Sequence, residues 1–545
     1  MCACIMKSSM ESHCLRFSEI PHTTKLFSSF VEDFARVARY FEQPPTMAGI
    51  VAAARKVALS PQVRSGVVDV LREQNRAFGV GADTFANLDR LAGGAAAIVT
   101  GQQVGLFTGP AYSLYKAISA VRYAEEASKN GVDAVPVFWL ATEDHDLAEI
   151  NHVEWTTEAG SAQFELPEAG AEAGRRVGEI KLGAGITELV GRATESLRGG
   201  FAEEIGRALR ESYTPEETYG SAFGKLMARL VAGRGIIFLD PLDQRLHRFS
   251  ANIYRRALDD ADSLRDALIA RSKELEHAGF HAQVKVSGGS TLLFYNVDGR
   301  REALRSRNGK FYAGHASFTL EELRAAIEKT PEAFTPNVLL RPIVQDTLLP
   351  TAAYIAGPAE IAYMAQAQVV YARLLGRMPA ILPRASFTIV EPLVGRKLEK
   401  FGFTITDVLR GRQQLRSRME QKYLPRALTR RFDAGEKALR RLMKSFRNPL
   451  EKLDRTLIDA LDSAEGKMLH QFGKIKGKAG RAENERRNVL DRYERLLLDS
   501  LYPHRGLQER SASPLPWMAG YGAGFLDELS RVVSVESQQH HIVRL

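Results

Sequence analysis

The chain has 545 residues, more than the roughly 250–300 at which a single hydrophobic core stops growing, so two or three domains are expected. Hydrophobic residues make up 45% and charged residues 26% of the sequence, which is typical of a globular protein large enough to be an enzyme. No apolar run approaches the roughly 20 residues that cross a bilayer, and the first ten residues contain no signal-peptide core, so the sequence predicts a cytoplasmic protein outside the membrane.

Cysteine usage excludes a disulfide-stabilised fold. The three cysteines, Cys2, Cys4 and Cys14, all lie close to the first residue, and none lies in the body of the chain. Two thiols at Cys-x-Cys spacing do not complete a metal site either. We therefore expect residues 1–14 to be a disordered leader outside the fold.

The net charge of +9 is concentrated in one segment. Residues 395–500 contain 27 Lys or Arg against 15 Asp or Glu, which leaves the rest of the chain slightly acidic. The cations of this segment are interleaved with acids along an apolar seam. That pattern favours the solvated face of a coiled coil over a nucleic-acid surface.

The first half of the chain predicts a parallel sheet. Apolar runs at 95–100 and 135–141 indicate two buried strands, and a helix with an apolar stripe lies between them up to about Lys129. A strand, a helix and a strand in this order form a βαβ unit with parallel strands. A further apolar run at 235–240 follows another helical segment and extends the same sheet. The prediction is an α/β fold with a doubly wound, Rossmann-like core.

The segment from 281 to 314 changes character. Val284 and Val286 alternate with polar residues and indicate one strand, and residues 292–297 indicate a second. Tight hairpin turns are predicted at the Asx-Gly pairs Asp298-Gly299 and Asn308-Gly309. We therefore expect a small antiparallel insertion before the core resumes.

The basic segment predicts long helices. Apolar residues follow a heptad seam at Leu428, Phe432, Leu439, Leu442 and Phe446, with spacings of 4, 7, 3 and 4. Gly435 occupies the missing position, where we expect it to pack nothing and to weaken the helix by roughly 1 kcal/mol relative to Ala. Asn448-Pro449 interrupts the seam, which resumes in two further stretches. Two or more helices that fold back as a coiled coil fit this pattern best.

Together these elements predict an order of domains. It is a leader at 1–14, the first part of the core at 15–280, an insertion with β-hairpins at 281–340, the second part of the core at 341–394, a helical coiled-coil domain at 395–502, and a C-terminal segment at 503–545 that packs back on the core.

Two loops are candidates for chemistry, because open parallel sheets bind ligands beyond the carboxyl ends of their strands. The first loop, 101–109, offers backbone N–H groups before a helix N-terminus, as a phosphate site requires, although such loops are often only tight connections. Its candidate nucleotide-binding residues are Gly101, Gln102, Gln103, Gly105, Thr108 and Gly109.

The second loop crowds three carboxylates around an imidazole, at Glu143, Asp144, His145 and Asp146. Like charges this close push pKa values apart, which is how sites obtain a general base near neutral pH. Asp144, His145 and Asp146 are therefore the candidate catalytic residues. Their carboxylates could also hold the Mg²⁺ of a nucleotide, but the spacing matches no metal motif. The alternative is an acid-rich helix N-terminus.

Six segments of the chain resemble the bacillithiol biosynthesis cysteine-adding enzyme family. They are FSEIPHTTKLF (17–27), IVTGQQVGLFTGPAYSLYKAISA (98–120), VPVFWLATEDHDLAEINHVEW (135–155), RPIVQDTLLPTAAYIAGPAEIAYMAQ (341–366), PAILPRASFTIVEP (379–392) and YPHRGLQER (502–510). The resemblance covers nearly the whole chain from about residue 15.

This resemblance implies a function as well as a fold. It implies a Rossmann-like core with insertions and a homodimer formed through the coiled coil. It also implies a cysteine ligase that adds L-cysteine to glucosaminyl malate in the last step of bacillithiol biosynthesis. ATP, or bound ADP, and Mg²⁺ are the expected cofactors. The malyl carboxylates need cationic partners, for which Lys116, Arg341 and Arg384 are the candidates.

Three other functions compete with the ligase. The basic segment suggests a nucleic-acid-binding protein, which we do not favour for the reason given above. The acids around His145 suggest a metal-dependent hydrolase built on residues 143–146. The third alternative is a scaffold in which the coiled coil is the function and the α/β core has lost its activity.

Overall fold

The computed structural model describes residues 12–157, 160–167, 172–422, 426–485 and 489–545. The chain divides into a first unit, residues 1–388 with 509–542, and a second unit, residues 389–508 with 543–545. Most of the predicted leader, residues 1–11, lies outside the described residues. The rest of it, residues 12–14, belongs instead to strand β1 (Ser12–Leu15), because β1 pairs at the edge of a three-stranded sheet with the order β1-β15-β14.

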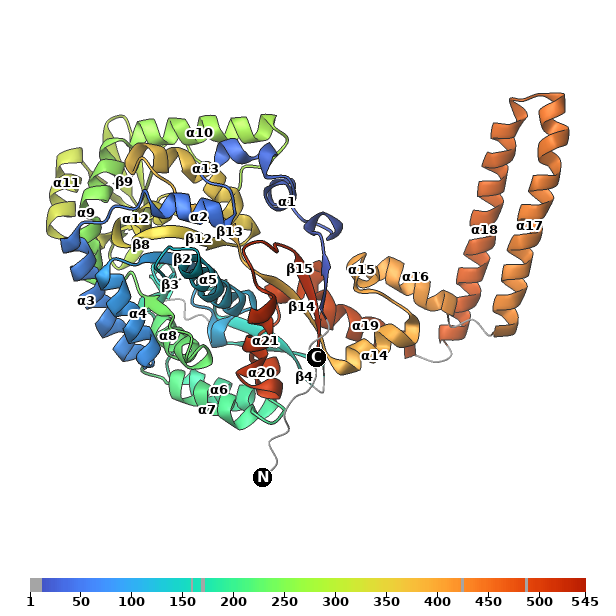
Figure 1. Cartoon of the computed structure of the whole chain (residues 1–545), viewed down its shortest axis with the longest axis horizontal. Coiled ribbons are helices and arrows are strands. Elements are labelled where there is room, and N and C mark those ends of the chain that lie inside the picture. The colour runs from blue at the N-terminus through green and yellow to red at the C-terminus, as the bar shows by residue number, and fades with distance from the viewer. Residues whose placement is uncertain (1–11, 158–159, 168–171, 423–425, 486–488) are drawn as a thin grey trace. The chain divides into compact units, whose positions relative to one another are not determined.

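A five-stranded parallel sheet forms the centre of the first unit (Figure 1). Its order is β13 (Ala380–Pro383), β12 (Thr351–Ala356), β2 (Ala96–Gln102), β3 (Ala134–Leu140) and β6 (Ile237–Leu239). The chain runs outward from β2 to β3 and β6, and later returns to the other side of β2 for β12 and β13. The order therefore reverses between β2 and β12, and in open α/β sheets such a switch point is where ligands bind.

Burial explains why these strands read as apolar runs. Every residue of β3 and the first six residues of β2 are buried, as parallel strands are when helices cover both faces of the sheet. Helix α5 (Tyr112–Lys129) packs on β2 and β3, and α13 (Pro358–Leu374) packs on β12 and β13. The two helices lie on opposite sides of the sheet (Figure 1). The predicted doubly wound core is confirmed.

Further helices, one strand pair and most of a three-stranded sheet complete the first unit. The helices are α1 (Lys25–Glu32), α2 (Met47–Ala54), α3 (Pro61–Phe78), α4 (Ala82–Gly93), α6 (Gly185–Ser196), α7 (Ala202–Ser212), α8 (Tyr219–Leu230), α9 (Gln244–Asp259), α10 (Ala261–His277), α11 (Leu320–Lys329), α12 (Arg341–Leu348), α20 (Leu515–Tyr521) and α21 (Gly524–Val532). Strands β4 (His152–Thr157) and β5 (Gly160–Glu165) pair with each other, and β14 (Ser386–Val390) and β15 (His540–Arg544) belong to the sheet of β1.

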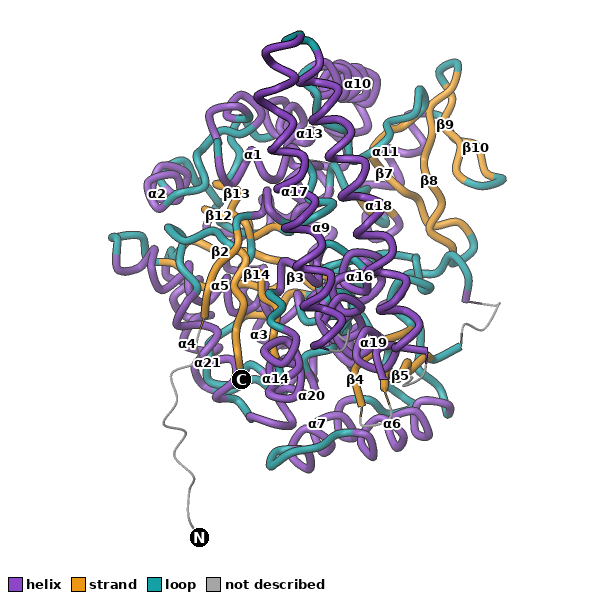
Figure 2. The backbone as a smooth tube through the Cα atoms, turned by 90° about the vertical axis from the view of Figure 1, so that its right-hand side faces the viewer, coloured by secondary structure: helices purple, strands orange, loops and turns teal. Residues whose placement is uncertain are grey.

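The predicted antiparallel insertion is present as a sheet of its own (Figure 2). Its order is β10 (Ala316–Phe318), β9 (Lys310–Ala313), β8 (Arg300–Arg307), β7 (Ser290–Val297) and β11 (Phe334–Pro336). All four residues of the two Asx-Gly turns have positive φ, as tight hairpin turns require.

The strand predicted at Val284 and Val286 is wrong. Residues 281–289 form no strand. The amide side chain of Gln366 accepts a hydrogen bond from the Val284 N–H at 2.8 Å and donates one to the Val284 carbonyl at 2.9 Å. One side chain of α13 therefore satisfies the groups that a neighbouring strand would have paired.

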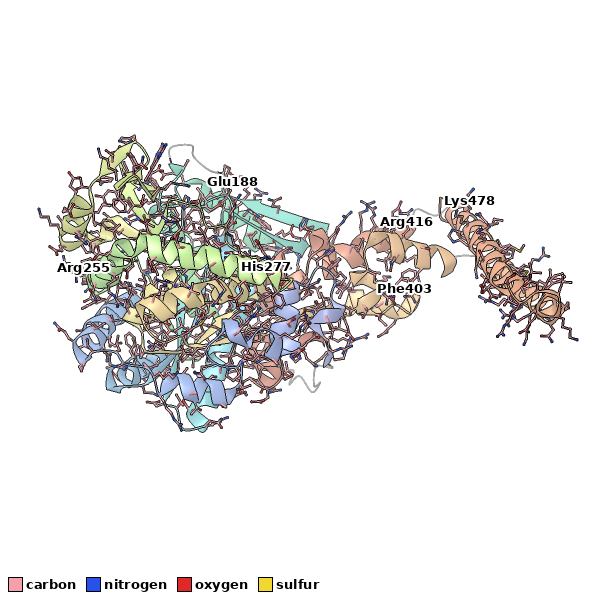
Figure 3. The ribbon with its side chains drawn as sticks, turned by 90° about the horizontal axis from the view of Figure 1, so that it is seen from above. Glu188, Arg255, His277, Phe403, Arg416 and Lys478 are labelled. Atoms are coloured by element: carbon pink, nitrogen blue, oxygen red, sulfur yellow. The ribbon has the colours of Figure 1, made fainter. Side chains whose placement is uncertain are left out.

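The second unit is helical. It contains α14 (Pro392–Phe401), α15 (Ile405–Leu409), α16 (Arg412–Lys422), α17 (Arg426–Leu453), α18 (Leu457–Glu485) and α19 (Val489–Leu501). Helices α17 and α18 lie side by side (Figure 2), and polar side chains such as Lys478 are exposed on them (Figure 3). The predicted pair of long helices is confirmed.

Two details of this hairpin differ from the prediction. Pro449 lies inside α17 and does not end it; a proline removes one backbone hydrogen bond, and here only four residues of the helix follow it. Gly435 packs closely against a side chain, contrary to the prediction. A Cβ atom at this position would lie 2.6 Å from Cζ of Phe472, whose ring also packs against Phe432 at a centroid distance of 5.4 Å. The glycine leaves room for that ring.

Candidate active site at the carboxyl edge of the sheet

The switch point between β2 and β12 holds a buried ion pair. Lys116 of α5 is 3% exposed, and its Nζ lies 2.5 Å from Oε2 of Glu360. The same ammonium group donates to the Gly101 carbonyl at 2.6 Å and to Oε1 of Gln102 at 2.9 Å. Lys116 therefore ties the end of β2 to the first turn of α13.

Glu360 is held by several donors at once. It accepts hydrogen bonds from the Gly357 N–H at 2.6 Å and from the Tyr354 hydroxyl at 2.7 Å, in addition to its ion pair with Lys116. Burial by itself would raise the pKa of Glu360, but Lys116 and these donors bring it below its ordinary value. Burial lowers the pKa of Lys116 more than Glu360 raises it. Because Lys116 is buried and the Glu360 side chain is only 17% exposed, removing either charge leaves the other uncompensated.

Arg341 begins α12 and faces the same cluster. Its guanidinium donates to Oε1 of Gln345 and to the Tyr354 hydroxyl, both at 3.1 Å. It also lies 5.7 Å from the ring centroid of Trp139 and 5.3 Å from that of Tyr354. Within the described part of the chain, no carboxylate forms an ion pair with Arg341; its acidic neighbour Glu360 pairs with Lys116. A guanidinium in these surroundings is suited to bind an anion.

Arg384, at the carboxyl end of β13, has a different environment. It is buried, and its guanidinium lies 2.6 Å from Oε1 of Glu509. Glu509 also accepts hydrogen bonds from the Ser386 hydroxyl and the Phe387 N–H. The structure thus brings Lys116, Arg341 and Arg384 to the same edge of the sheet, and Glu509 already neutralises the charge of Arg384.

The glycine-containing loop is folded into the protein. The N–H groups of Gly105, Leu106 and Gly109 donate to backbone carbonyls, and Thr108 is fully buried. A Cβ atom on Gly105 would lie 3.0 Å from Cα of Gly109, so the glycines allow the loop to double back on itself. These three N–H groups and the Thr108 side chain face protein atoms. A phosphate site at this loop stays a prediction.

Gln103 connects the loop to the acids after β3. Its side-chain N–H₂ donates to Oδ2 of Asp144 at 2.9 Å and to Oε2 of Glu149 at 2.6 Å. Oδ1 of Asp144 accepts from the His145 N–H at 2.7 Å. Burial would raise the pKa of Asp144, but hydrogen bonds from His145 and Gln103 and the charge of Arg301 hold it below its ordinary value. Asp144 is therefore ionised at neutral pH.

The remaining acids of this loop point elsewhere. Asp146 is exposed, and its Oδ1 accepts from the Glu149 N–H at 3.3 Å. Glu143 turns into the core, where its Oε1 lies 3.5 Å from Nε2 of His247 on α9. Burial raises the pKa of Glu143 to about 7 and lowers that of His247 to about 4. Among the described residues, no group of three or more His, Cys, Asp or Glu side chains could hold a metal ion, so Asp144, His145 and Asp146 do not form one ligand set.

Sequence reasoning missed three side chains of this edge. Arg301 of β8 donates through Nη1 to Nδ1 of His145 at 3.0 Å, and no local pattern in the hairpin sequence indicates that contact. Tyr354 and Glu360 had a usable signal: they flank Gly357, where β12 ends and α13 begins. The rule that directed attention to the ends of β2 and β3 applies there equally.

A cavity of about 1080 Å³ lies at the opposite, amino edge of the sheet, beside Ala134 and Gly235. The arginines that line it form ion pairs, as Arg234 does with Asp527 at 2.5 Å. Among the described residues, Arg341 at the carboxyl edge forms no ion pair with a carboxylate, unlike these arginines, and we place the site at that edge.

Comparison with known proteins decides the family. Residues 10–385 match the Rossmann-like N-terminal domain of bacillithiol biosynthesis BshC, and residues 387–545 match its C-terminal coiled-coil domain. The chain belongs to the BshC family. The resemblance drawn from the six segments is thereby confirmed. Across the described residues of this BshC-family chain, no helix is both long enough and apolar enough to cross a membrane.

Curated members of the BshC family are similar to this chain over nearly their full length. The protein named "Putative cysteine ligase BshC" from Koribacter versatilis is 41% identical over 532 residues, which cover 98% of this chain and 99% of the relative. The protein of the same name from Solibacter usitatus is 36% identical over 540 residues, covering 98% and 100%. That from Salinibacter ruber is 33% identical over 531 residues, covering 95% and 96%.

Proposed function

We propose that this chain is a cysteine ligase that joins L-cysteine to glucosaminyl malate, in the last step of bacillithiol biosynthesis, with ATP to activate the carboxyl group. The names of its relatives support the ligase class. The observation that supports the substrate is Arg341, a largely enclosed cation whose described partners are an amide, a hydroxyl and two rings. A carboxylate of the malyl group would complete its environment. ATP and cytoplasmic cysteine also make the cytoplasm the expected site of action.

The reaction requires activation, because a carboxylate does not condense with an amine in water unaided. ATP serves as a co-substrate that converts one carboxylate oxygen into part of a leaving group, and Mg²⁺ accompanies its phosphates. Three N–H groups of loop 101–109 already donate to backbone carbonyls, and the described residues include no group of three or more His, Cys, Asp or Glu side chains that could hold a metal ion. We therefore assign no position to the nucleotide and derive no step from its location.

The residues of the carboxyl edge divide the remaining tasks. Arg341 binds the malyl carboxylate, and the pair of Lys116 with Glu360 holds the surrounding backbone in place. Asp144, which its neighbours keep ionised, is available to accept a hydrogen bond from the cysteine ammonium group. Arg384 has a structural role, because its charge is paired with that of Glu509.

We also propose that two copies of the chain associate through α17 and α18. Large apolar side chains of these helices are exposed, including Leu442 at 54%, Phe446 at 48% and Ile475 at 57%. A second copy would cover them. Sedimentation equilibrium of the full chain should show a dimer, and Leu442→Glu with Phe446→Glu should shift it to monomer. A monomeric wild-type protein at micromolar concentration would contradict the dimer.

The direct test of the ligase is a product assay with the purified full chain, ATP, Mg²⁺, L-cysteine and glucosaminyl malate. Mass spectrometry should detect the amide product and, in equal amount, either ADP or AMP. Omission of ATP should abolish the product. A folded protein that binds glucosaminyl malate and cysteine but forms no product under these conditions would overturn the proposal.

A further inference from the structure

One contact at the carboxyl edge fixes the protonation of a candidate catalytic residue. Nη1 of Arg301 lies 3.0 Å from Nδ1 of His145. A guanidinium has N–H donors and no acceptor, so it can bond to a ring nitrogen only where that nitrogen presents its lone pair. When Arg301 donates to it, Nδ1 of His145 carries no proton, and in the neutral ring the proton then resides on Nε2.

The position of Arg301 is determined independently of His145. Its Nε donates to the Thr335 hydroxyl at 2.9 Å, and its Nη2 donates to the Pro336 carbonyl at 2.8 Å. The guanidinium also lies over the ring of Phe294, 3.7 Å from its centroid. Because the insertion sheet supplies all three anchors, Nη1 stays directed at His145.

Asp144 is the group that could favour the opposite tautomer. Its Oδ1 lies 3.5 Å from Nδ1 of His145, farther than Arg301, and 3.9 Å from the Arg301 guanidinium. Oδ1 is already bonded to the His145 N–H, and Oδ2 to Gln103. The other ring facing His145 is Phe294, at a centroid distance of 5.7 Å, which carries no charge. Arg301, the nearer of the two groups, therefore determines the tautomer of His145.

We propose that Arg301 is a positioning residue that holds His145 as the neutral Nε2–H tautomer, so that His145 donates a hydrogen bond to the reacting carbonyl oxygen instead of acting as a general base. This inference rests on the ligase function proposed above. The His145 side chain is 39% exposed, so its outer edge can reach a ligand. A preorganised neutral donor of this kind stabilises the charge that develops on oxygen in the transition state.

The chemical step can then be written without proton transfer at His145. The glucosaminyl ammonium group first gives one proton to water, and its nitrogen then forms the new C–N bond with the activated cysteine carboxyl carbon. The carbonyl π pair moves onto oxygen, which accepts the Nε2–H hydrogen bond. When the C=O bond forms again, the activating phosphate or AMP leaves with the C–O electron pair. The surplus proton on nitrogen passes to water, and His145 ends the step as it began.

The tautomer can be measured without any activity. The chain contains 12 histidines, and ¹⁵N-histidine labelling with long-range ¹H–¹⁵N correlation distinguishes bare from protonated ring nitrogens; His145→Gln assigns the resonance. At a pH where the ring is neutral, His145 should show a bare Nδ1 and a protonated Nε2. Arg301→Met should shift the balance toward Nδ1–H, facing Asp144, and exposed Arg307→Met on the same strand should leave it unchanged.

Activity measurements then distinguish the two possible roles of His145, hydrogen-bond donor and general base. A glutamine amide can donate a hydrogen bond but cannot take up a proton, so His145→Gln should stay within about tenfold of the wild-type kcat, while His145→Ala should lose about 10²–10³-fold, as for a lost oxyanion donor. Equal losses in both variants would overturn the donor role. A protonated Nδ1 in the wild-type protein would overturn the inference whatever the activity, whereas the expected tautomer in a protein that forms no product would count against the ligase alone.

Discussion

Ion pairs are enclosed at the carboxyl edge of the sheet and exposed on the α17–α18 hairpin. At the edge, two ion pairs are largely enclosed: Lys116 is 3% exposed beside Glu360, and Glu509 is 1% exposed beside Arg384. On the hairpin, charged side chains form ion pairs at the surface, and apolar ones such as Leu453 are 78% exposed. Buried pairs fix geometry because breaking them is costly, whereas surface pairs contribute little. The two regions should therefore respond very differently to single substitutions.

The largest effect is expected from breaking the buried pair at the switch point. Lys116→Met leaves the Glu360 carboxylate buried without its cation and should lower the free energy of unfolding of the first unit by about 3–5 kcal/mol. The double variant Lys116→Met with Glu360→Gln should be more stable than Lys116→Met alone, because no uncompensated charge remains. Urea denaturation followed by circular dichroism measures both.

The matched control is an exposed pair in the same unit. Lys181 and Glu216 lie 2.8 Å apart with side chains 65% and 83% exposed, so Lys181→Met should leave the denaturation midpoint unchanged. A Lys116→Met protein that is as stable as the Lys181→Met protein would show that the buried pair does not hold the edge together.

The pair of Glu143 and His247 should produce opposite pH dependences. The folded-state pKa of Glu143 is raised to about 7, so its contribution to stability is lost as pH rises from about 4.5 to 7. That of His247 is lowered to about 4, so its contribution is lost as pH falls from about 6.5 to 4. Each amounts to about 3 kcal/mol over its window, and in the wild-type protein the two nearly cancel between these limits.

Single variants should reveal the separate pH dependences of Glu143 and His247. Relative to wild type, Glu143→Gln should gain stability as pH rises from about 4.5 to 7, and His247→Gln should lose stability as pH rises from about 4 to 6.5. Denaturation curves at five or six pH values give both differences, and groups common to all three proteins cancel. Two differences with the same sign would show that these groups do not titrate against each other.

The smallest effect concerns the hairpin. Gly435→Ala adds a methyl group where the Phe472 ring lies, and the crowding should outweigh the roughly 1 kcal/mol that alanine gains in helix propensity, so the hairpin should melt at a lower temperature. Gly466→Ala, on α18, meets no atom within 4 Å and should raise the melting temperature instead. If both variants stabilise the hairpin, the close contact with Phe472 has no energetic consequence.

The sequence predicts local and periodic features well and long-range contacts poorly. The parallel core follows from apolar runs separated by a helix, and the tight turns follow from Asp298-Gly299 and Asn308-Gly309, because both signals are local. The strand expected at Val284 failed because a side chain 82 residues away, Gln366, satisfies its backbone. Gly435 was misjudged for the same reason, since the ring that needs its space belongs to another helix.

The candidate site shows the same division. The rule on strand ends located loops 101–109 and 142–146, and the family resemblance suggested the three cations. Neither showed which cation is neutralised: the partner of Arg384, Glu509, lies 125 residues further along the chain. The rule also did not show that the acids of one loop point in different directions. Arg301 could not be found at all, because its role depends on how the insertion sheet meets the core.

The measurement that tests the account most directly is the product assay run in parallel on the wild-type protein, Arg341→Met and Arg307→Met. The account predicts the cysteine amide of glucosaminyl malate from wild type and Arg307→Met, and at least a 100-fold lower rate from Arg341→Met that circular dichroism shows to be folded. Equal rates from all three proteins, or no product from the wild type, would contradict a cysteine ligase with its substrate site at the carboxyl edge of the sheet.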